Sequence, residues 1–510
     1  MKDTINEILS NEELEILQEC NELTLDFTSF SKDILSIVTP HCVVIGYGEL
    51  CDEFLALCVN EKHTALEVLH LLPQDFVRLS GHLGDFKLYF KNAQGEIDEI
   101  TTSQVVSFAP LENLPHFKGV HTPNMYDSAD SMLQVLLSLC GEQAYSRHIV
   151  FDPLHCQYQG RRTLPNGDNI CHSCVDICPT MGVSSDDSLK ILQLSPIDCI
   201  ACGKCVSVCP TGSMQREGDG LEAFTYKARL YKGRIPLIIA RSDFESPHFT
   251  HNFRALRKHN SLLLPFVLEV PDMLNSTYFL TLLQESSSSV VVYTPLGEHI
   301  HDEVESINTI YKRIFDKEAI FFYQEDALSC LDEIAPLTQS HYIYTPTSKE
   351  SSKDIFAERM RFWIKQEEYG KVAIKGFGIV GIDAQNCTMC LSCVEACNTN
   401  ALINNNSSFE LLYKSSLCTD CGYCVASCAE KVLSIESHIL NLIPQSFEYT
   451  KIAADEPFRC VECDKIFATR KSIEKIKGIL APAFGSDTLK LKTLECCADC
   501  KVKVMFEGAH

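Results

Sequence analysis

The chain has 510 residues, 27 of them cysteine, and a formal net charge of −24 at pH 7. This length gives room for about three to five domains. The strong negative charge argues against general nucleic-acid binding and suits electrostatic docking to basic patches on a protein partner. Because no signal-peptide core and no run of about 18 apolar residues occurs, we expect no membrane insertion and a cytoplasmic protein with reduced thiols.

Residues 1–150 are expected to form a mixed α/β domain with a Rossmann-like turn. The β-branched run 41–45 leads into Gly46-x-Gly48 and an amphipathic stretch. Strand, Gly-x-Gly and helix begin a dinucleotide fingerprint, which makes Gly46 and Gly48 candidate nucleotide-binding residues. However, Cys51 replaces the third glycine and no acidic ribose ligand follows, so we favour an empty turn and expect neither flavin nor NAD.

Residues 79–90 alternate in polarity and predict a hairpin. They are similar to a stretch of the A-type subunit of heterodisulfide reductase, where it precedes a ferredoxin module. The resemblance implies that an iron–sulfur module follows.

Residues 151–215 contain the first of two cysteine groups. Its second run has the form Cys-x2-Cys-x2-Cys-x3-Cys, which is the bacterial spacing for paired [4Fe–4S] clusters. Three thiolates on one tight loop reach three corners of a cubane, and the fourth cysteine of each run ligates the other cluster. One cluster, called site 2, is therefore assigned to Cys178, Cys199, Cys202 and Cys205.

The neighbouring cluster, called site 1, has three ligands in register and two candidates for the fourth. The three in register are Cys171, Cys174 and Cys209. Asp168 stands where the spacing places the fourth ligand, and a carboxylate there gives a labile iron. Both cysteine groups begin with an Asp-x3-Cys segment, which ends at Cys156 in the first group and at Cys387 in the second. The first group has twelve extra residues between Cys156 and the next ligand. We expect Cys156 to be the ligand and keep Asp168 as the alternative.

The insertion contains a polar, turn-rich stretch, residues 159–167, with the pair Arg161-Arg162. Paired arginines suit an acidic partner. A docking loop and a solvated loop without a role are both open interpretations.

Residues 216–345 predict a second α/β domain. The apolar runs 234–240 and 289–293 are typical of buried strands, with a helix around 276–283. The pattern resembles the delta subunit of methyl-viologen-reducing hydrogenase, which often follows heterodisulfide reductase modules. Since the cysteines of that family are missing and only Cys330 lies nearby, the resemblance implies a scaffold or docking surface without its own cluster.

Residues 346–375 predict a linker helix with the only tryptophan, Trp363, and residues 376–440 contain the second cysteine group. Seven cysteines of the first group lie 219 residues before their counterparts here, as Cys171 does before Cys390. By the same crossed rule, site 3 is assigned to Cys387, Cys390, Cys393 and Cys428. Site 4 is assigned to Cys397, Cys418, Cys421 and Cys424.

These cysteines resemble those of bacterial 2[4Fe–4S] ferredoxins, over about 120 of the 510 residues. A chain with two such modules resembles the polyferredoxins that serve redox enzymes. The resemblance implies a redox partner of the dehydrogenase or hydrogenase class, with formate dehydrogenase favoured. The chain departs from the family pattern at the first ligand of site 1, and Asn398 and Ala429 stand where proline commonly follows the fourth cysteine.

Residues 441–510 contain two further Cys-x2-Cys pairs, formed by Cys460, Cys463, Cys497 and Cys500. Their separation fits a four-cysteine zinc ribbon or treble clef. Zinc is preferred; a rubredoxin-like iron, free thiols and a further cubane are alternatives. Residues 456–510 carry ten Lys or Arg against eight Asp or Glu, so this end has a small positive net charge. It is interpreted either as a docking surface for an acidic partner or as a solvated basic helix.

Other candidates are weaker. The remaining isolated cysteines follow no ligand spacing and are interpreted as small core side chains: Cys20, Cys42, Cys51, Cys58, Cys140 and Cys330. His299 and His301 are compatible with a metal site, although a polar surface run is favoured. No nucleophile elbow, P-loop or zinc-protease motif occurs.

The sequence therefore predicts a multidomain α/β and α+β protein with two ferredoxin-type modules, two small α/β domains and a zinc-ribbon-like C-terminal module. The expected function is electron transfer by four [4Fe–4S] clusters, with one zinc. A flavin-dependent oxidoreductase component and a maturation factor for a redox enzyme are the alternatives. The partner, the potentials, the oligomeric state and electron exchange between the modules stay open.

Overall fold

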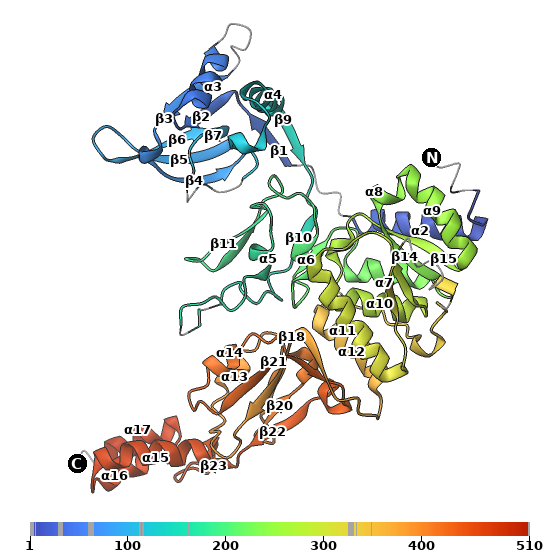
Figure 1. Cartoon of the computed structure of the whole chain (residues 1–510). Coiled ribbons are helices and arrows are strands. Elements are labelled where there is room, and N and C mark those ends of the chain that lie inside the picture. Colours follow the sequence, from blue (N-terminus) through green and yellow to red (C-terminus); the bar gives the residue numbers. More distant parts are fainter. Residues whose placement is uncertain are drawn as a thin grey trace.

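The computed structural model describes residues 5, 7–28, 34–59, 66–111, 114, 117–161, 163–164, 166–324, 331–332, 334–347 and 349–507. Arg162 and Cys330 lie outside these residues. Within them, the first cysteine module lies between the N-terminal unit, a central α/β unit and the second cysteine module, while the C-terminal module forms one end of the molecule (Figure 1). No helix in the described part of the chain combines the length and apolar character needed to span a membrane.

The N-terminal unit, residues 34–145, places a parallel sheet of order β3-β2-β7-β8 between two helices and an antiparallel sheet β4-β5-β6. Val44 of β2 packs with Phe54 on the helix side, whereas Val43 packs with Phe86 on the other, because successive strand residues point to opposite faces. The predicted hairpin is β4 and β5. The elements are β1 (Ile34–Val38), β2 (His41–Ile45), α3 (Glu49–Val59), β3 (Glu67–Leu71), β4 (Phe76–His82), β5 (Asp85–Lys91), β6 (Ile97–Thr102), β7 (Gln104–Ser107), β8 (Val120–His121), α4 (Ala129–Leu139) and β9 (Gly141–Tyr145).

The central unit is built on a parallel sheet of order β15-β14-β16-β17. Every residue of β14 is buried, as a strand covered on both faces requires. The predicted strands and helix of this region are β14, β16 and α10; β15 adds an edge strand. The elements are α2 (Asn11–Asp26), α7 (Leu221–Leu230), β14 (Ile235–Ala240), α8 (Arg241–Phe244), α9 (Pro247–His259), β15 (Leu263–Leu268), α10 (Ser276–Ser286), β16 (Val290–Val292), α11 (Glu298–Phe315), β17 (Ile320–Phe322) and α12 (Ser352–Ile364).

Two helices differ from the sequence expectation. α2 falls within the range predicted for the N-terminal domain, yet it packs against α7 and β15 of the central unit, where buried Glu13 pairs with Arg234 and Arg257, both at 2.9 Å. α12 falls within the predicted linker, but it packs against α10 with Trp363 buried. Both helices therefore complete the core of the central unit.

The two cysteine modules share one plan of short helices beside small antiparallel sheets. In the second module, residues 371–454, β22 pairs with β20 and extends the module beyond the expected boundary at 440. The first module, residues 149–216, contains β10 (Ile149–Phe151), α5 (Ser173–Asp176), β11 (Val183–Asp186), β12 (Ile191–Leu194), α6 (Lys204–Ser207) and β13 (Met214–Arg216). The second contains β18 (Lys371–Ile382), α13 (Ser392–Glu395), β19 (Leu402–Asn405), β20 (Glu410–Tyr413), α14 (Tyr423–Ala426), β21 (Leu433–Asn441) and β22 (Thr450–Ala454).

The C-terminal module, residues 457–507, is a short hairpin followed by three helices (Figure 1). The hairpin is formed by β23 (Pro457–Arg459) and β24 (Ile466–Thr469), and the helices are α15 (Arg470–Phe484), α16 (Thr488–Thr493) and α17 (Ala498–Glu507).

A buried ion pair in the central unit gives a stability prediction. Arg359 of α12 donates to Glu285 of α10 at 3.0 Å, and both side chains are fully buried. Glu285→Ala leaves the guanidinium buried without its carboxylate, so we expect a loss of about 3–5 kcal/mol. Urea unfolding measures this loss when it is followed by the fluorescence of Trp363, which lies on α12 together with Arg359. The exposed Glu305→Ala on α11 is the control, expected within about 0.5 kcal/mol of the wild type; a similarly small effect of Glu285→Ala would contradict the prediction.

Candidate metal centres

The expected ligands of site 1 converge from three parts of the first module. Cys156 follows β10, Cys209 follows α6, and the other two cysteines stand at the start of α5. A cavity of about 340 Å3 is lined by Cys156, Cys171, Cys174 and Cys209. Asp168 does not line this cavity; it is exposed and accepts a hydrogen bond from Asn166 at 2.6 Å. The structure thus gathers Cys156, and not Asp168, with the other three.

The four cysteines assigned to site 2 are also neighbours. Burial, followed by the charges of Cys199, Cys202 and Cys178, raises the pKa of the Cys205 thiol to about 12. Cys205 lies on α6, and the Cys178 thiol donates to the carbonyl of Thr180 at 3.2 Å.

Sites 3 and 4 each surround a cavity of nearly the same size as that of site 1. The site 3 cavity, about 360 Å3, is lined by Cys387, Cys390, Cys393 and Cys428. The site 4 cavity, about 340 Å3, is lined by Cys397, Cys418, Cys421 and Cys424. Cys390 is exposed and the other seven ligands are buried or half-buried, so site 3 is the more open of the two.

The backbone of the ligand loops has a repeated conformation. After Cys199, Cys387 and Cys418, the second and fourth following residues all have positive φ, as at Met389 (55°) and Leu391 (62°). Left-handed conformations cost roughly 1–2 kcal/mol for a residue with a Cβ. These turns wrap the chain around the space between three thiols. The Cys171–Cys174 segment of site 1 lacks them among the described positive-φ residues, because its first ligand comes from a separate part of the chain.

Crowding makes these thiols unfavourable as bare thiolates. Burial, with neighbouring cysteines, raises the pKa of Cys393 to about 12, and burial raises the pKa of Cys418 to about 11. A bound metal ion supplies the positive charge that deprotonates a coordinating thiol. Four converging sulfurs around a cavity therefore fit an iron–sulfur cluster.

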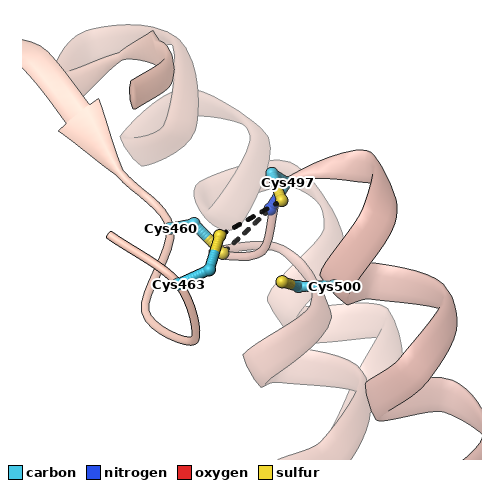
Figure 2. Close-up of side chains that lie close together, drawn as sticks. All are labelled: Cys460, Cys463, Cys497 and Cys500. Carbon is cyan, nitrogen blue, oxygen red and sulfur yellow. Dashed lines mark hydrogen bonds between the residues drawn. The ribbon is translucent and has the colours of Figure 1, made fainter. Parts of the chain in front are cut away.

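The C-terminal cysteines form a much tighter group. The sulfurs of Cys460, Cys463, Cys497 and Cys500 all lie within 4.8 Å of one another and point to a common centre (Figure 2). The Cys463 and Cys497 sulfurs are 3.7 Å apart. Tetrahedral Zn–S bonds of about 2.3 Å place sulfurs roughly 3.8 Å apart, so the group fits one metal ion rather than a cubane.

One pair stands on the β23–β24 turn and the other at the start of α17, so the second pair lies on a helix and not on a second hairpin. Burial raises the pKa of the Cys460 thiol, but backbone N–H donors, including Cys497 at 3.3 Å, outweigh it and lower the pKa to about 6. Cys496 is outside the group; its thiol donates to the carbonyl of Lys492 at 3.3 Å.

The Gly46-x-Gly48 turn has a packing role. A Cβ on Gly46, whose φ is +143°, would lie 2.7 Å from the Cβ of Phe108. The ring of His70 also contacts the Gly46 carbonyl at 2.8 Å. Close packing thus favours glycine at position 46; nucleotide binding by Gly46 and Gly48 stays a prediction.

Of the weaker candidates, His299 lines a cavity that is also lined by the cluster ligands Cys171, Cys209 and Cys421. Cys42, Cys51 and Cys58 are buried in the N-terminal unit, and Cys20 and Cys140 are half-buried. His301 stacks on Phe322 with ring centroids 4.7 Å apart.

Direct contacts join the two cysteine modules, and sequence reasoning missed them. Asn398, beside the site 4 ligand Cys397, donates to the carbonyl of Cys156 at 3.1 Å. Arg161 donates to the carbonyl of Ala396 at 2.8 Å, so its side chain turns toward the second module. A docking role for residues 159–167 stays a prediction. The one available signal was Asn398 itself, where ferredoxins commonly have proline.

Comparison with known families supports the metal chemistry. Family models of the 4Fe-4S dicluster domain match residues 169–213 and residues 379–429. The chain therefore contains two ferredoxin-like iron–sulfur domains. The second match spans the cysteines of sites 3 and 4, whereas the first begins after Cys156. No curated protein matches the chain. The resemblances of the flanking regions to heterodisulfide reductase and to the hydrogenase delta subunit stay predictions.

Exchange of the candidate ligands tests the geometry of site 1. In Cys156→Ser we expect the loss of about one to four iron atoms per chain and a three-iron EPR signal in the oxidised protein, because one corner loses its thiolate. Asp168→Asn is the control and is expected to keep its full iron content. The opposite pattern, with iron lost only in Asp168→Asn, would make the carboxylate the ligand.

Proposed function

We propose that this protein is an iron–sulfur electron carrier with four [4Fe–4S] clusters, one at each of sites 1–4. The observation that carries the proposal is the crossed grouping of the cysteines. At each of sites 1, 3 and 4, a single cavity is lined by three cysteines and by the fourth cysteine of the other half-motif. The clusters, when bound, supply one-electron redox chemistry.

The chain itself tunes the sites through hydrogen bonds and burial. At site 1, the backbone N–H groups of Tyr158 and Gln159 both lie 3.4 Å from the Cys156 sulfur. At site 3, burial opposes ionisation of Cys390, but the N–H of Ser392 and further donors outweigh it and lower the pKa of that thiol. Such differences between sites support distinct reduction potentials along the protein.

The proposed partner is a redox enzyme of the dehydrogenase or hydrogenase class, and formate dehydrogenase is favoured by the polyferredoxin resemblance. The net charge of −24 supports docking to a basic patch on that enzyme. Cluster ligation needs reduced thiols, which supports a cytoplasmic location. The maturation-factor and flavin-enzyme alternatives stay predictions.

For the C-terminal module we propose a structural zinc that stabilises the contact with site 3. Thr469, at the end of β24, donates to the carbonyl of Thr388 within the site 3 loop at 3.0 Å. Lys471 of α15 donates to the carbonyl of Ala384 at 2.8 Å. A metal ion that joins β23–β24 to α17 would therefore also support the loop that presents Cys387 and Cys390.

Metal analysis of the anaerobically purified protein tests the carrier proposal. We expect about sixteen iron, about sixteen acid-labile sulfide and about one zinc per chain, without flavin, and spin-coupled cubane EPR signals after dithionite reduction. Substantially fewer iron atoms would reduce the number of sites. Stoichiometric flavin would instead favour a flavin-dependent oxidoreductase.

Removal of one C-terminal ligand tests the zinc proposal. In Cys500→Ala we expect loss of about one zinc per chain with iron unchanged. Cys496→Ala, at the adjacent cysteine outside the group, is the control and should keep its zinc. Because metal binding needs deprotonated thiols, metal uptake by the zinc-depleted module should weaken as pH falls; the lowered pKa of Cys460 keeps that thiol ionised at lower pH than an ordinary cysteine. Zinc retained by Cys500→Ala would contradict the assignment.

A further inference from the structure

The two cysteine modules, far apart in the sequence, touch through their ligand loops. Asn398 follows the site 4 ligand Cys397, and its side chain reaches the carbonyl of the site 1 ligand Cys156 at 3.1 Å. A second hydrogen bond joins residues that directly follow ligands of the two sites. Gln157, after Cys156, donates to Thr419, after Cys418, at 2.9 Å, and this bond is buried. Residues adjacent to ligands of both sites are therefore in direct contact.

Arg161 occupies the same junction. Its guanidinium donates to the carbonyl of Ala396, next to Cys397, at 2.8 Å and lies 5.9 Å from the ring centre of Tyr423. One cation thus joins the segment that follows the site 1 ligand Cys156 to the residue beside the site 4 ligand Cys397.

A shared cavity supports the same pairing. A cavity between the two modules and the central unit is lined by Cys171 and Cys209 of site 1 and by Cys421 of site 4. No ligand of site 2 or site 3 is among the described residues that line this cavity. The site 2 loop packs at Gly203 against Met273 of the central unit, and the site 3 loop contacts Thr469 of the C-terminal module.

Within each module the two sites are also neighbours. Cys205 of site 2 lies on α6 and Cys209 of site 1 follows that helix, while Cys393 of site 3 lies on α13 and Cys397 of site 4 follows that helix. The contacts therefore order the four sites as 2, 1, 4 and 3.

We propose that the two modules form one continuous electron path in the order 2–1–4–3, and that Asn398 and Arg161 are the positioning residues of its central step between sites 1 and 4. This inference rests on the proposed function. The step moves one electron and no atom: the giving site is oxidised by one electron as the receiving site is reduced, and an external redox protein supplies the first electron. Sites 2 and 3 are the two ends, so donor and acceptor would engage the protein at different places.

The test uses the full-length, cluster-loaded protein with Asn398→Pro and Arg161→Met, singly and together. Asn398→Pro removes the side-chain donor and installs the residue that ferredoxins commonly have there. Ala429→Pro is the matched control, because it makes the same change after Cys428, a site 3 ligand, at an exposed position. Arg161→Lys keeps the positive charge and loses the planar fork of donors.

Three readouts are taken on each variant: iron content, EPR of the fully reduced protein, and freeze-quench EPR of electron equilibration between the modules. We expect every variant to keep the wild-type iron content. In the double variant, the spin–spin interaction between sites 1 and 4 should weaken and equilibration should slow on the order of tenfold or more, the scale on which small displacements of reacting groups act. Arg161→Met alone should lower the midpoint potentials of sites 1 and 4 only, and Arg161→Lys should recover most of that shift.

The two proposals fail in different ways. If the wild type holds its four clusters but the double variant shows unchanged spin interaction and equilibration, the modules work separately and the path is wrong while the carrier function stands. The same conclusion follows if Ala429→Pro has as large an effect as Asn398→Pro. If the wild type holds no reducible clusters, the proposed function fails, and the path fails with it.

Discussion

The structure depends above all on bringing buried thiols together in groups of four. Each group is unfavourable as a set of bare thiolates, since burial and mutual repulsion raise the pKa of ligands such as Cys205 and Cys393 to about 12. The ligand loops also hold non-glycine residues such as Met389 and Asp420 in left-handed conformations. Metal binding would relieve the electrostatic cost, so in this protein cluster binding and folding of the loops are coupled.

The parts of the chain without cluster ligands supply the rigid surroundings that these loops need. Gly203 and Gly212, both with positive φ, approach the central unit so closely that a Cβ would lie 3.0 Å from Met273 and 2.9 Å from Ser352. Met273 ends the 3-10 turn that precedes α10, and Ser352 is the first residue of α12. At the other module, α15 contacts the site 3 loop through Lys471. The site 2 loop, the turn after Cys209 and the site 3 loop are thus each packed against an element outside the cysteine modules.

What could be predicted from the sequence was what is encoded locally. Cysteine spacing indicated the ligand groups, and continuous apolar runs predicted β14 and β16. β15 was not predicted from the sequence; it lies at the sheet edge, where its Pro265 is tolerated. The place of α2 was not predictable, because Glu13 finds its arginine partners more than 200 residues away in the sequence. The spacing alone pointed to Asp168 as the fourth ligand of site 1. Cys156 was identified only by comparing the Asp-x3-Cys segments that end at Cys156 and at Cys387.

The junction between the modules explains why this chain departs from the usual ferredoxin pattern where it does. The insertion after Cys156 provides Arg161, which lies beyond the length of a two-residue spacer and reaches the second module. Gln157, directly after the ligand, contacts the same module. Proline at position 398 would offer no side-chain donor for the Cys156 carbonyl, whereas asparagine does. Both departures therefore meet at one interface, and each supplies a hydrogen bond across it. Nothing in the structure explains Ala429, which is exposed at the equivalent position beside site 3. Ala429 replaces proline beside site 3 without forming a contact, whereas Asn398 replaces proline beside site 4 and forms one. This difference supports the junction between sites 1 and 4 as a feature of the proposed electron path and not of the ferredoxin fold.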